Sequence, residues 1–284
     1  MTAGKRFDDA LEELLVARNP RGMQSLRAAL QPGYYRRASA LLADARRLLI
    51  GTGFPVAGTF ETDGPVGAMA LYRALEQRGA QCWIACATPL AAELENAFRV
   101  LPLQATDRDA AREEATLRLA QVTPDAIISI ERPGLAADGR YYNMRGEDIS
   151  ADCGIFDCYL ELAECPTIAI GDGGNEIGMG KIAEAVAKLA ITPAATSCDE
   201  LLVADVSNWG AYGLLAYFDL LEATDHLGAL RPRELLAFLS SRGSVDGVTR
   251  ENTLTEDGMD PSAGETIISE LRALAAAALR EASA

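Results

Sequence analysis

The segment of residues 166–188, PTIAIGDGGNEIGMGKIAEAVAK, constrains the fold of this chain more than any other. Residues 167–170 form a short β-branched and apolar run, which is typical of a buried strand. Glycines then interrupt the run, and after Glu176 the apolar residues Ile182, Val186 and Leu189 recur at helical spacing. We therefore predict a strand, a glycine turn and a helix in direct succession.

The glycine turn has features of a reaction site. It brings backbone N–H groups to a predicted helix N-terminus, where an anion is favoured. It also carries the carboxylates of Asp172 and Glu176. Nucleotide-binding templates fit poorly, because Asn175 stands where a P-loop has glycine and Glu176 where a dinucleotide fingerprint has its third glycine. We expect no nucleotide cofactor; the alternative interpretation of the segment is a tight turn with solvated acids.

Three times along the chain a predicted strand ends in a polar or glycine turn that leads into a helix. These turns are residues 51–63, 171–176 and 205–209. Alternating strands and helices predict an α/β fold with a mostly parallel sheet and helices on both faces, in Rossmann-like layers. In such sheets the site lies at the carboxyl ends of the strands. We therefore expect the three turns to share one edge, with Glu131 and Arg132 as a fourth contributor.

The chain is predicted to form one α/β domain over residues 1–284, with a helical N-terminal extension over 1–45 and a C-terminal helix over 262–284. Asp63 is predicted to cap the helix that follows it, and Ser262 to cap the final helix. That final helix is rich in alanine, and it could pack on its own domain or on a second subunit. A homodimer is therefore one expectation for the assembly.

The composition argues against several classes of binding partner, cellular location and metal site. The net charge of −15, from 26 basic and 41 acidic residues, argues against nucleic acid and anionic membranes as partners. No apolar run reaches the length of a membrane span. The N-terminus lacks the apolar core of a signal peptide, and the six cysteines form no C-x-x-C pair, so we expect a cytoplasmic protein. A single histidine, His226, excludes a three-histidine zinc site.

Without a usable histidine, proton transfer falls to carboxylates, Lys, Tyr or a metal-bound water. Clustered carboxylates raise one another's pKa, or they bind a hard cation such as Mg or Mn. Residues 138–150 form either an exposed loop or a clamp for a carboxylate or phosphate. We expect a small acidic substrate. The candidate pocket comprises Glu61, Asp63, Arg132, Arg145, Asp172, Asn175, Glu176, Asp205 and Asn208.

Four stretches of the sequence together resemble the D-glutamate cyclase-like family. They are residues 61–68, 131–150, 171–180 and 207–210, within a similarity that runs from about residue 48 to 255. The resemblance implies a lyase that closes D-glutamate to 5-oxo-D-proline with loss of water. It also implies activation by a divalent ion, Mn or Mg.

In that reaction the α-amine attacks the γ-carboxyl carbon, so the amine must lose protons and an oxyanion must be stabilised. As hypotheses, Asp172 or Glu176 moves the proton, and the N–H groups of Gly173 and Gly174, or a metal ion, stabilise the oxyanion. The predicted catalytic residues are Asp172, Glu176, Asn175, Asp63 and Asn208; the substrate-binding residues are Arg132, Arg145, Gly173, Gly174 and Glu61; the metal ligands are Asp172, Glu176 and Asp63.

Two other hypotheses stay open at this point. The chain could be an enzyme that acts on a phosphorylated metabolite or nucleotide at the same turns. It could also be a non-catalytic protein that binds an acidic metabolite. The paired acids favour catalysis over binding alone, and the poor fit to nucleotide templates counts against the phosphorylated substrate.

Overall fold

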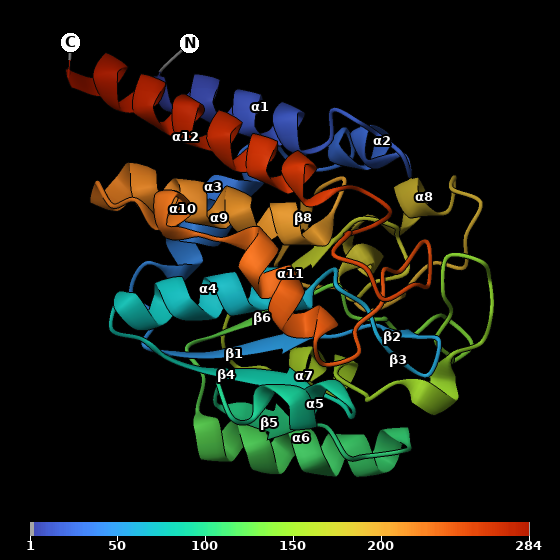
Figure 1. Cartoon of the computed structure of the whole chain (residues 1–284). Coiled ribbons are helices and arrows are strands. Elements are labelled where there is room, and N and C mark those ends of the chain that lie inside the picture. Colours follow the sequence, from blue (N-terminus) through green and yellow to red (C-terminus); the bar gives the residue numbers. More distant parts are fainter. Residues whose placement is uncertain (1–2, 284) are drawn as a thin grey trace.

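A parallel sheet forms the centre of the structure (Figure 1). The computed structural model describes residues 3–283, and within them this sheet has six strands in the order β5-β4-β1-β6-β7-β8. Every neighbouring pair is parallel, which confirms the predicted α/β fold. The strands are β1 (Arg47–Thr52), β4 (Gln81–Cys86), β5 (Val100–Pro102), β6 (Ala126–Ile130), β7 (Thr167–Gly171) and β8 (Glu200–Val203).

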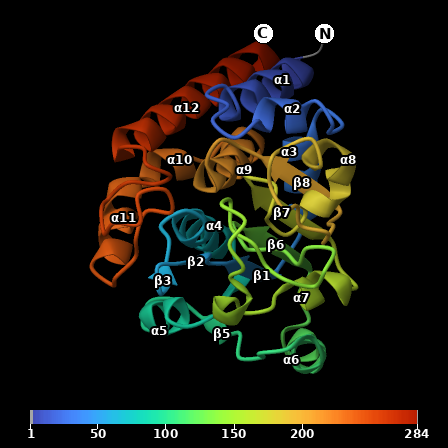
Figure 2. The same ribbon diagram turned by 90° about the vertical axis from the view of Figure 1, so that its right-hand side faces the viewer.

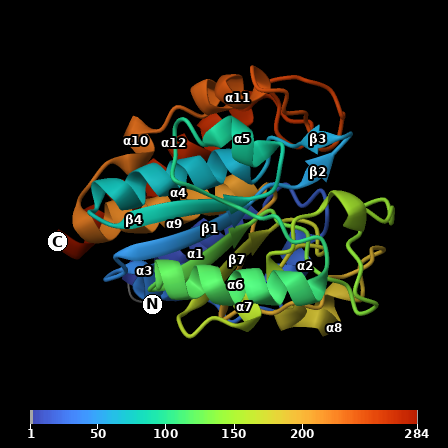
Figure 3. The same ribbon diagram turned by 90° about the horizontal axis from the view of Figure 1, so that it is seen from below.

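Helices cover both faces of this sheet. The central strands β6 and β7 are buried at every residue, which requires cover on each side. On one face lie α4 (Pro65–Gln77) and α9 (Ser207–Glu222), and on the other lie α6 (Arg108–Val122) and α7 (Asp157–Glu161). Figures 2 and 3 show these two layers with the strands between them. The predicted Rossmann-like layering is thus confirmed.

The two ends of the described chain pack together. Helix α1 (Ala3–Leu15) contacts α12 (Pro261–Ser283), and α12 also packs on α9 (Figure 1). The final helix thus packs within its own chain. No helix in residues 3–283 combines the length and apolarity that a membrane crossing requires. The predictions of one domain, a homodimer and a cytoplasmic location stay predictions, and residues 1, 2 and 284 lie outside the described residues.

The remaining elements connect this framework. Helix α3 (Tyr34–Leu42) packs beside β8 and α9, and the predicted long loop after β1 contains a short hairpin, β2 (Pro55–Val56) and β3 (Thr59–Phe60). The other helical elements are α2 (Met23–Arg27), α5 (Leu90–Leu94), η1 (Ser150–Asp152), η2 (Met179–Ile182), α8 (Ala183–Val186), α10 (His226–Ala229) and α11 (Pro232–Ser240).

The strand order places a switch point at the centre of the sheet. From β1 the chain proceeds outward through β4 and β5, and from β6 it proceeds outward in the other direction through β7 and β8. The carboxyl ends of β1 and β6 therefore flank a crevice, which is where such sheets bind ligands. The turns after β1, β6, β7 and β8 lie along this one edge, as the sequence predicts.

The prediction of a helix directly after the glycine turn is wrong. Gly178 has a φ of 99°, so the chain is not helical there, and only the short η2 and α8 follow. A Cβ at Gly178 would overlap the side chain of Ala169 on β7, and one at Gly180 would overlap the backbone at Ala195. The glycines thus allow two segments of this chain to approach closely. No helix begins at the turn itself, but Ser207 N at the start of α9 donates to Asp172 Oδ2 at 3.2 Å.

Two predicted helix caps are also wrong. The residue that precedes α4 is Gly64, and Asp63 instead accepts hydrogen bonds from the first residues of α9. At α12 the side chain of Asp260 accepts from the backbone N–H of Ser262 at 2.9 Å, so the cap is Asp260. Local spacing alone does not show that Asp63 serves a helix more than a hundred residues away.

Candidate active site

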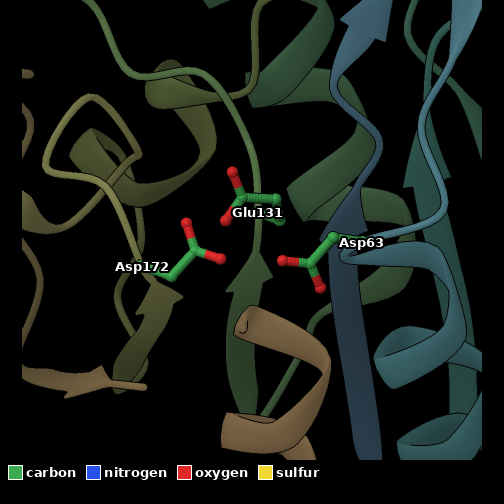
Figure 4. A group of neighbouring side chains, drawn as sticks. All are labelled: Asp63, Glu131 and Asp172. Atoms are coloured by element: carbon green, nitrogen blue, oxygen red, sulfur yellow. The ribbon is translucent and has the colours of Figure 1, made fainter. Parts of the chain in front are cut away.

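Three buried carboxylates converge at the carboxyl ends of the strands. Asp63 precedes α4, Glu131 follows β6 and Asp172 follows β7, and each is at most 6% exposed. One carboxylate oxygen from each lies within 4.8 Å of the others. Figure 4 shows the three side chains pointing toward one another. We call Asp63, Glu131 and Asp172 the acid triad.

Asp63 is held by the backbone at the start of α9. Its Oδ2 accepts from Ser207 N at 2.9 Å, and its Oδ1 accepts from Asn208 N at 2.7 Å. Asn208 returns the contact, because its Oδ1 accepts from Gly64 N and Gly67 N at 2.9 and 2.7 Å. Asn208 is fully buried and belongs to the join between α4 and α9, so it positions Asp63 and does not line the cavity described below.

The glycine turn encloses a carboxylate of its own chain. Gly174 N donates to Glu176 Oε2 at 2.7 Å. A Cβ at Gly173 would stand 2.7 Å from Glu176 Oε1, and one at Gly171 would stand 2.9 Å from Glu176 Oε2. The turn thus needs glycine to admit Glu176, and the Gly174 N–H is no longer available to a substrate oxyanion. The predicted roles of Glu176 as proton carrier and metal ligand do not agree with this enclosure.

A cavity of about 470 Å³ opens beside the acid triad. Its buried end is lined by acids and two polar residues, and its mouth is formed by the β2–β3 hairpin and two loops, residues 143–149 and 247–250. The buried end comprises Arg21, Glu61, Glu131, Asp172, Asn175 and Asp257; the exposed residues at the mouth include Ala57, Met144, Arg145, Glu147, Val248 and Arg250.

Arg21 is the cation among the residues of the buried end. Its Nη2 lies 2.6 Å from Asp172 Oδ2, and it also forms an ion pair with Asp257. The guanidinium donates to the backbone oxygens of Asp172 and Asp205, each at 3.1 Å. The loop that carries Arg21 is fixed by Asp205, whose carboxylate accepts from the backbone N–H groups of residues 18 and 19. Asp205 therefore supports the site from outside the cavity.

The single positive charge of Arg21 does not balance the negative charges of the acids buried around it. Burial raises the pKa of Asp63 to about 6, and the charge of Asp257 adds to the shift. Burial raises the pKa values of Glu61, Glu131 and Asp172 well above the ordinary range. Neighbouring acids raise them further, whereas Arg21 lowers the pKa of Asp172. Groups tuned in this way can hold or release a proton near neutral pH.

Two acceptors in the cavity wall, the Glu61 carboxylate and Asn175 Oδ1, have no protein partner within residues 3–283. The Glu61 carboxylate is 6% exposed and makes no hydrogen bond or ion pair with this part of the chain. Asn175 Oδ1 is also buried without a partner, while its Nδ2 donates to the backbone oxygen of Tyr142 at 2.9 Å. Both residues are among the predicted set. An amide oxygen buried without a donor is costly, so Asn175 Oδ1 indicates a ligand that donates hydrogen bonds, and the Glu61 carboxylate, which faces the cavity, can accept from the same ligand.

The two predicted arginines lie in different places. Arg145 is exposed at the mouth and donates to the backbone oxygen of Val248 at 3.2 Å. The guanidinium of Arg132 is buried and donates to the backbone oxygens of Thr52, Gly53 and Gly154. Its contacts do not agree with the prediction that it binds a substrate carboxylate. Arg132 instead fixes the chain after β1.

Sequence reasoning placed Glu131 at this edge of the sheet but left it out of the candidate pocket, and it did not find Arg21, Asp257 and Arg250. Glu131 stands at a strand end beside Arg132, so the strand-end rule that selected Asp63 could have selected it. Arg21, Asp257 and Arg250 lie in turns far from any strand end, and nothing in the local pattern marks them. Only the tertiary fold brings them to the sheet.

The acid triad fits a hard divalent ion. It offers oxygen atoms alone, which are the ligands that Mg and Mn prefer. Its three carboxylates are buried, and the nearby cation, Arg21, is paired with Asp172 and Asp257. The Glu176 carboxylate does not belong to this group. Of the predicted metal ligands, Asp63 and Asp172 are in the group, and its third member is Glu131 instead of Glu176.

Comparison with known proteins identifies the family. The family described as D-glutamate cyclase-like, C-terminal matches residues 11–272. The mitochondrial D-glutamate cyclase of Homo sapiens is 37% identical over 205 residues, which cover 63% of this chain and 33% of the human protein. The chain thus spans about a third of that relative. A solved exopolyphosphatase-related protein from Bacteroides fragilis has a TM-score of 0.45 and 11% identity, and the match covers 88% of this chain and 59% of that one. Because the family match extends over most of the sequence, the chain belongs to the D-glutamate cyclase-like family.

Proposed function

We propose that the chain cyclises D-glutamate to 5-oxo-D-proline with loss of water. The observation that carries the proposal is the division of charge in the cavity. Unpartnered acceptors, Glu61 and Asn175 Oδ1, lie at the buried end, and the arginines Arg145 and Arg250 lie at the mouth. An amino acid has an ammonium group and a carboxylate, which match these two ends. The family and the human relative support the same substrate.

The ammonium group of the substrate would bind at the buried end. It has three N–H donors, and Glu61 and Asn175 Oδ1 supply acceptors that the chain itself leaves unused. Gly247 makes room for this arrangement, because a Cβ there would overlap the Glu61 carboxylate. The α-carboxylate would bind the guanidinium groups of Arg145 and Arg250, which suit planar anions.

We assign proton transfer to Glu61. Burial and the charges of Asp257 and Asp63 raise its pKa, which makes its carboxylate a stronger base. It would take a proton from the ammonium group, so that the nitrogen can attack the γ-carboxyl carbon. The N–C bond forms as a C–O bond breaks, and both protons that leave the nitrogen end on the departing oxygen, which leaves as water. Glu61 carries them across this short path.

Asp63, Glu131 and Asp172 would hold the divalent ion that the family resemblance implies. When bound, such an ion stabilises negative charge on a carboxyl oxygen. Asn208 and Ser207 would keep Asp63 in place through their backbone N–H groups, and Arg21 would keep Asp172 in place. The chain's own contribution there is to present three carboxylates at fixed positions.

The test is turnover of D-glutamate and L-glutamate in the presence of Mn, with the product identified by chiral chromatography. We expect 5-oxo-D-proline from D-glutamate, and we expect Glu61→Gln to lower kcat by about 10²–10⁴-fold, the usual contribution of a general base. The matched control is Glu113→Gln, which removes an exposed acid on α6. Absence of 5-oxoproline from both enantiomers contradicts the function, and full turnover by folded Glu61→Gln contradicts the assigned role.

A further inference from the structure

The mouth of the cavity carries apolar surface that free glutamate does not use. Six large apolar residues are exposed within the described chain, and two of them, Met144 and Val248, lie at this mouth at 37% and 51% exposure. Phe54 and Val56 of the hairpin segment line the same mouth. Exposed apolar side chains that gather at one site mark a binding surface. The side chain of glutamate, in contrast, consists of two methylenes between charged groups.

The cavity is also larger than glutamate requires. Its volume of about 470 Å³ lies in the range of pockets that bind drug-sized molecules. The apolar wall is fixed by contacts between the loops, since Arg145 donates to the backbone oxygen of Val248 and Arg250 Nη2 donates to Glu147 Oε2 at 2.7 Å. The space beside the arginines is therefore a formed part of the site.

The charge of the buried end favours a neutral group at the reacting carbon. For ring closure the γ-carbon must lie beside the amine, close to Glu61, Glu131 and Asp172. A free γ-carboxylate brings a further negative charge beside these acids, so it would depend on the ion held by the acid triad to offset the repulsion. An amide at the same carbon has no charge. It is also a better electrophile than a carboxylate anion.

We propose that this site accepts γ-linked glutamyl amides, and that the apolar mouth binds the amine that leaves. The inference rests on the proposed function, since it uses the same ring closure. The α-nitrogen attacks the γ-carbonyl carbon, the new N–C bond forms, and the C–N bond to the departing amine breaks. Both protons that leave the α-nitrogen end on the departing amine, which leaves as an ammonium ion. The products are 5-oxoproline and that amine, and no co-reactant is needed.

Three substrates test the proposal with the full chain: free D-glutamate, its γ-N-methyl amide and its γ-N-butyl amide. Chromatography measures 5-oxoproline and the released amine. We expect both amides to exceed free D-glutamate in kcat/KM. We expect the butyl amide to exceed the methyl amide by at least about tenfold, because a single methylene in an apolar pocket is worth that much.

Variants at the mouth test the location. Val248→Ser should lower the ratio of butyl to methyl kcat/KM toward one, and the matched control Leu117→Ser, at a 71% exposed residue of α6, should leave the ratio unchanged. Cyclisation of free D-glutamate without cyclisation of either amide overturns the inference and leaves the proposed function standing. An equal rate for the two amides also overturns it. Failure of all three substrates contradicts the proposed function itself.

Discussion

Glu61 and Glu176 are both buried acids near strand ends, yet their neighbours give them different tasks. Glu176 receives the N–H of Gly174 and is enclosed by the turn that precedes it. Glu61 faces the cavity and receives no hydrogen bond from residues 3–283. A carboxylate that is already satisfied stabilises the backbone around it. One that faces a cavity without a protein donor is free to accept hydrogen bonds from a ligand that enters it.

Another buried acid, Glu12, does not line the cavity and allows a test of how burial affects the pKa of a carboxyl group. It is 1% exposed on α1, and its Oε1 accepts from Gly33 N at 2.7 Å and Tyr34 N at 3.0 Å. Burial raises its pKa from 4.5 to about 7. The folded chain thus binds this proton more tightly than the unfolded chain does, so the free energy of unfolding falls as pH rises from about 4.5 to about 7.

We predict that Glu12→Gln removes this part of the pH dependence, because the amide oxygen still accepts both N–H groups and carries no charge. The gain over the parent should be up to about 3 kcal/mol above pH 7 and should vanish below pH 4.5. Urea unfolding across this range measures it. Glu270→Gln, at an exposed residue of α12, is the control and should change nothing. A parallel shift at every pH would show that burial of the charge is not the cause.

At the scale of elements, the junction between α4 and α9 holds the site in place. Asp63 accepts from the first N–H groups of α9, and Asn208 accepts from N–H groups at the start of α4. Asn208 Nδ2 and Trp209 Nε1 both donate to the buried Glu256. Side chains at each helix start thus accept hydrogen bonds from backbone N–H groups at the other, which have no partner within their own helix. This junction fixes the position of Asp63 in the acid triad.

The segment after β7 shows a different use of backbone. Gly178 has a φ of 99° and lies directly on Ala169 of β7. We predict that Gly178→Ala lowers the free energy of unfolding by several kcal/mol, because the new Cβ adds a steric overlap to the strain of the positive φ. Urea unfolding provides the measurement.

Gly58→Ala is the matched control for this substitution. Gly58 also has a positive φ, 78°, but a Cβ there would meet no atom within 4 Å. Gly58→Ala should therefore lower the free energy of unfolding only by the backbone strain, about 1–2 kcal/mol. Equal losses for the two variants would mean that φ alone accounts for Gly178.

For the molecule as a whole, the fold follows from the sequence further than the site does. The apolar run over residues 167–170 predicted β7 to within one residue, because a buried parallel strand is a local pattern. The strand-end rule placed Asp63 and Asp172 correctly. It did not find Arg21, which lies 151 residues along the chain from its ion-pair partner Asp172. It also did not find Asp257, which lies 236 residues from its partner Arg21. Arg132 was selected by position, and only its three carbonyl contacts show its structural task.

Arg21 is the residue through which the N-terminal helices reach the sheet edge. Its loop follows α1 and is anchored on Asp205, and its guanidinium joins Asp172 after β7 to Asp257 before α12. The side chains of Asp172 and Asp257 are 3% and 7% exposed. Loss of the cation would leave both carboxylates buried among other acids.

We predict that Arg21→Met lowers the free energy of unfolding by about 3–5 kcal/mol at pH 8, the usual cost of removing one member of a buried ion pair. The loss should be smaller at pH 5. Arg21 lowers the pKa of Asp172, so without Arg21 that pKa rises further, and protonation of the folded state relieves the repulsion as pH falls. Arg233→Met is the control, because its pair with Glu265 is exposed and should contribute at most about 1 kcal/mol. If urea unfolding gives the two variants the same small loss at both pH values, the Arg21 ion pairs do not hold the N-terminal helices at the site, and the packing of α1 against α12, α9 and α3 must do so.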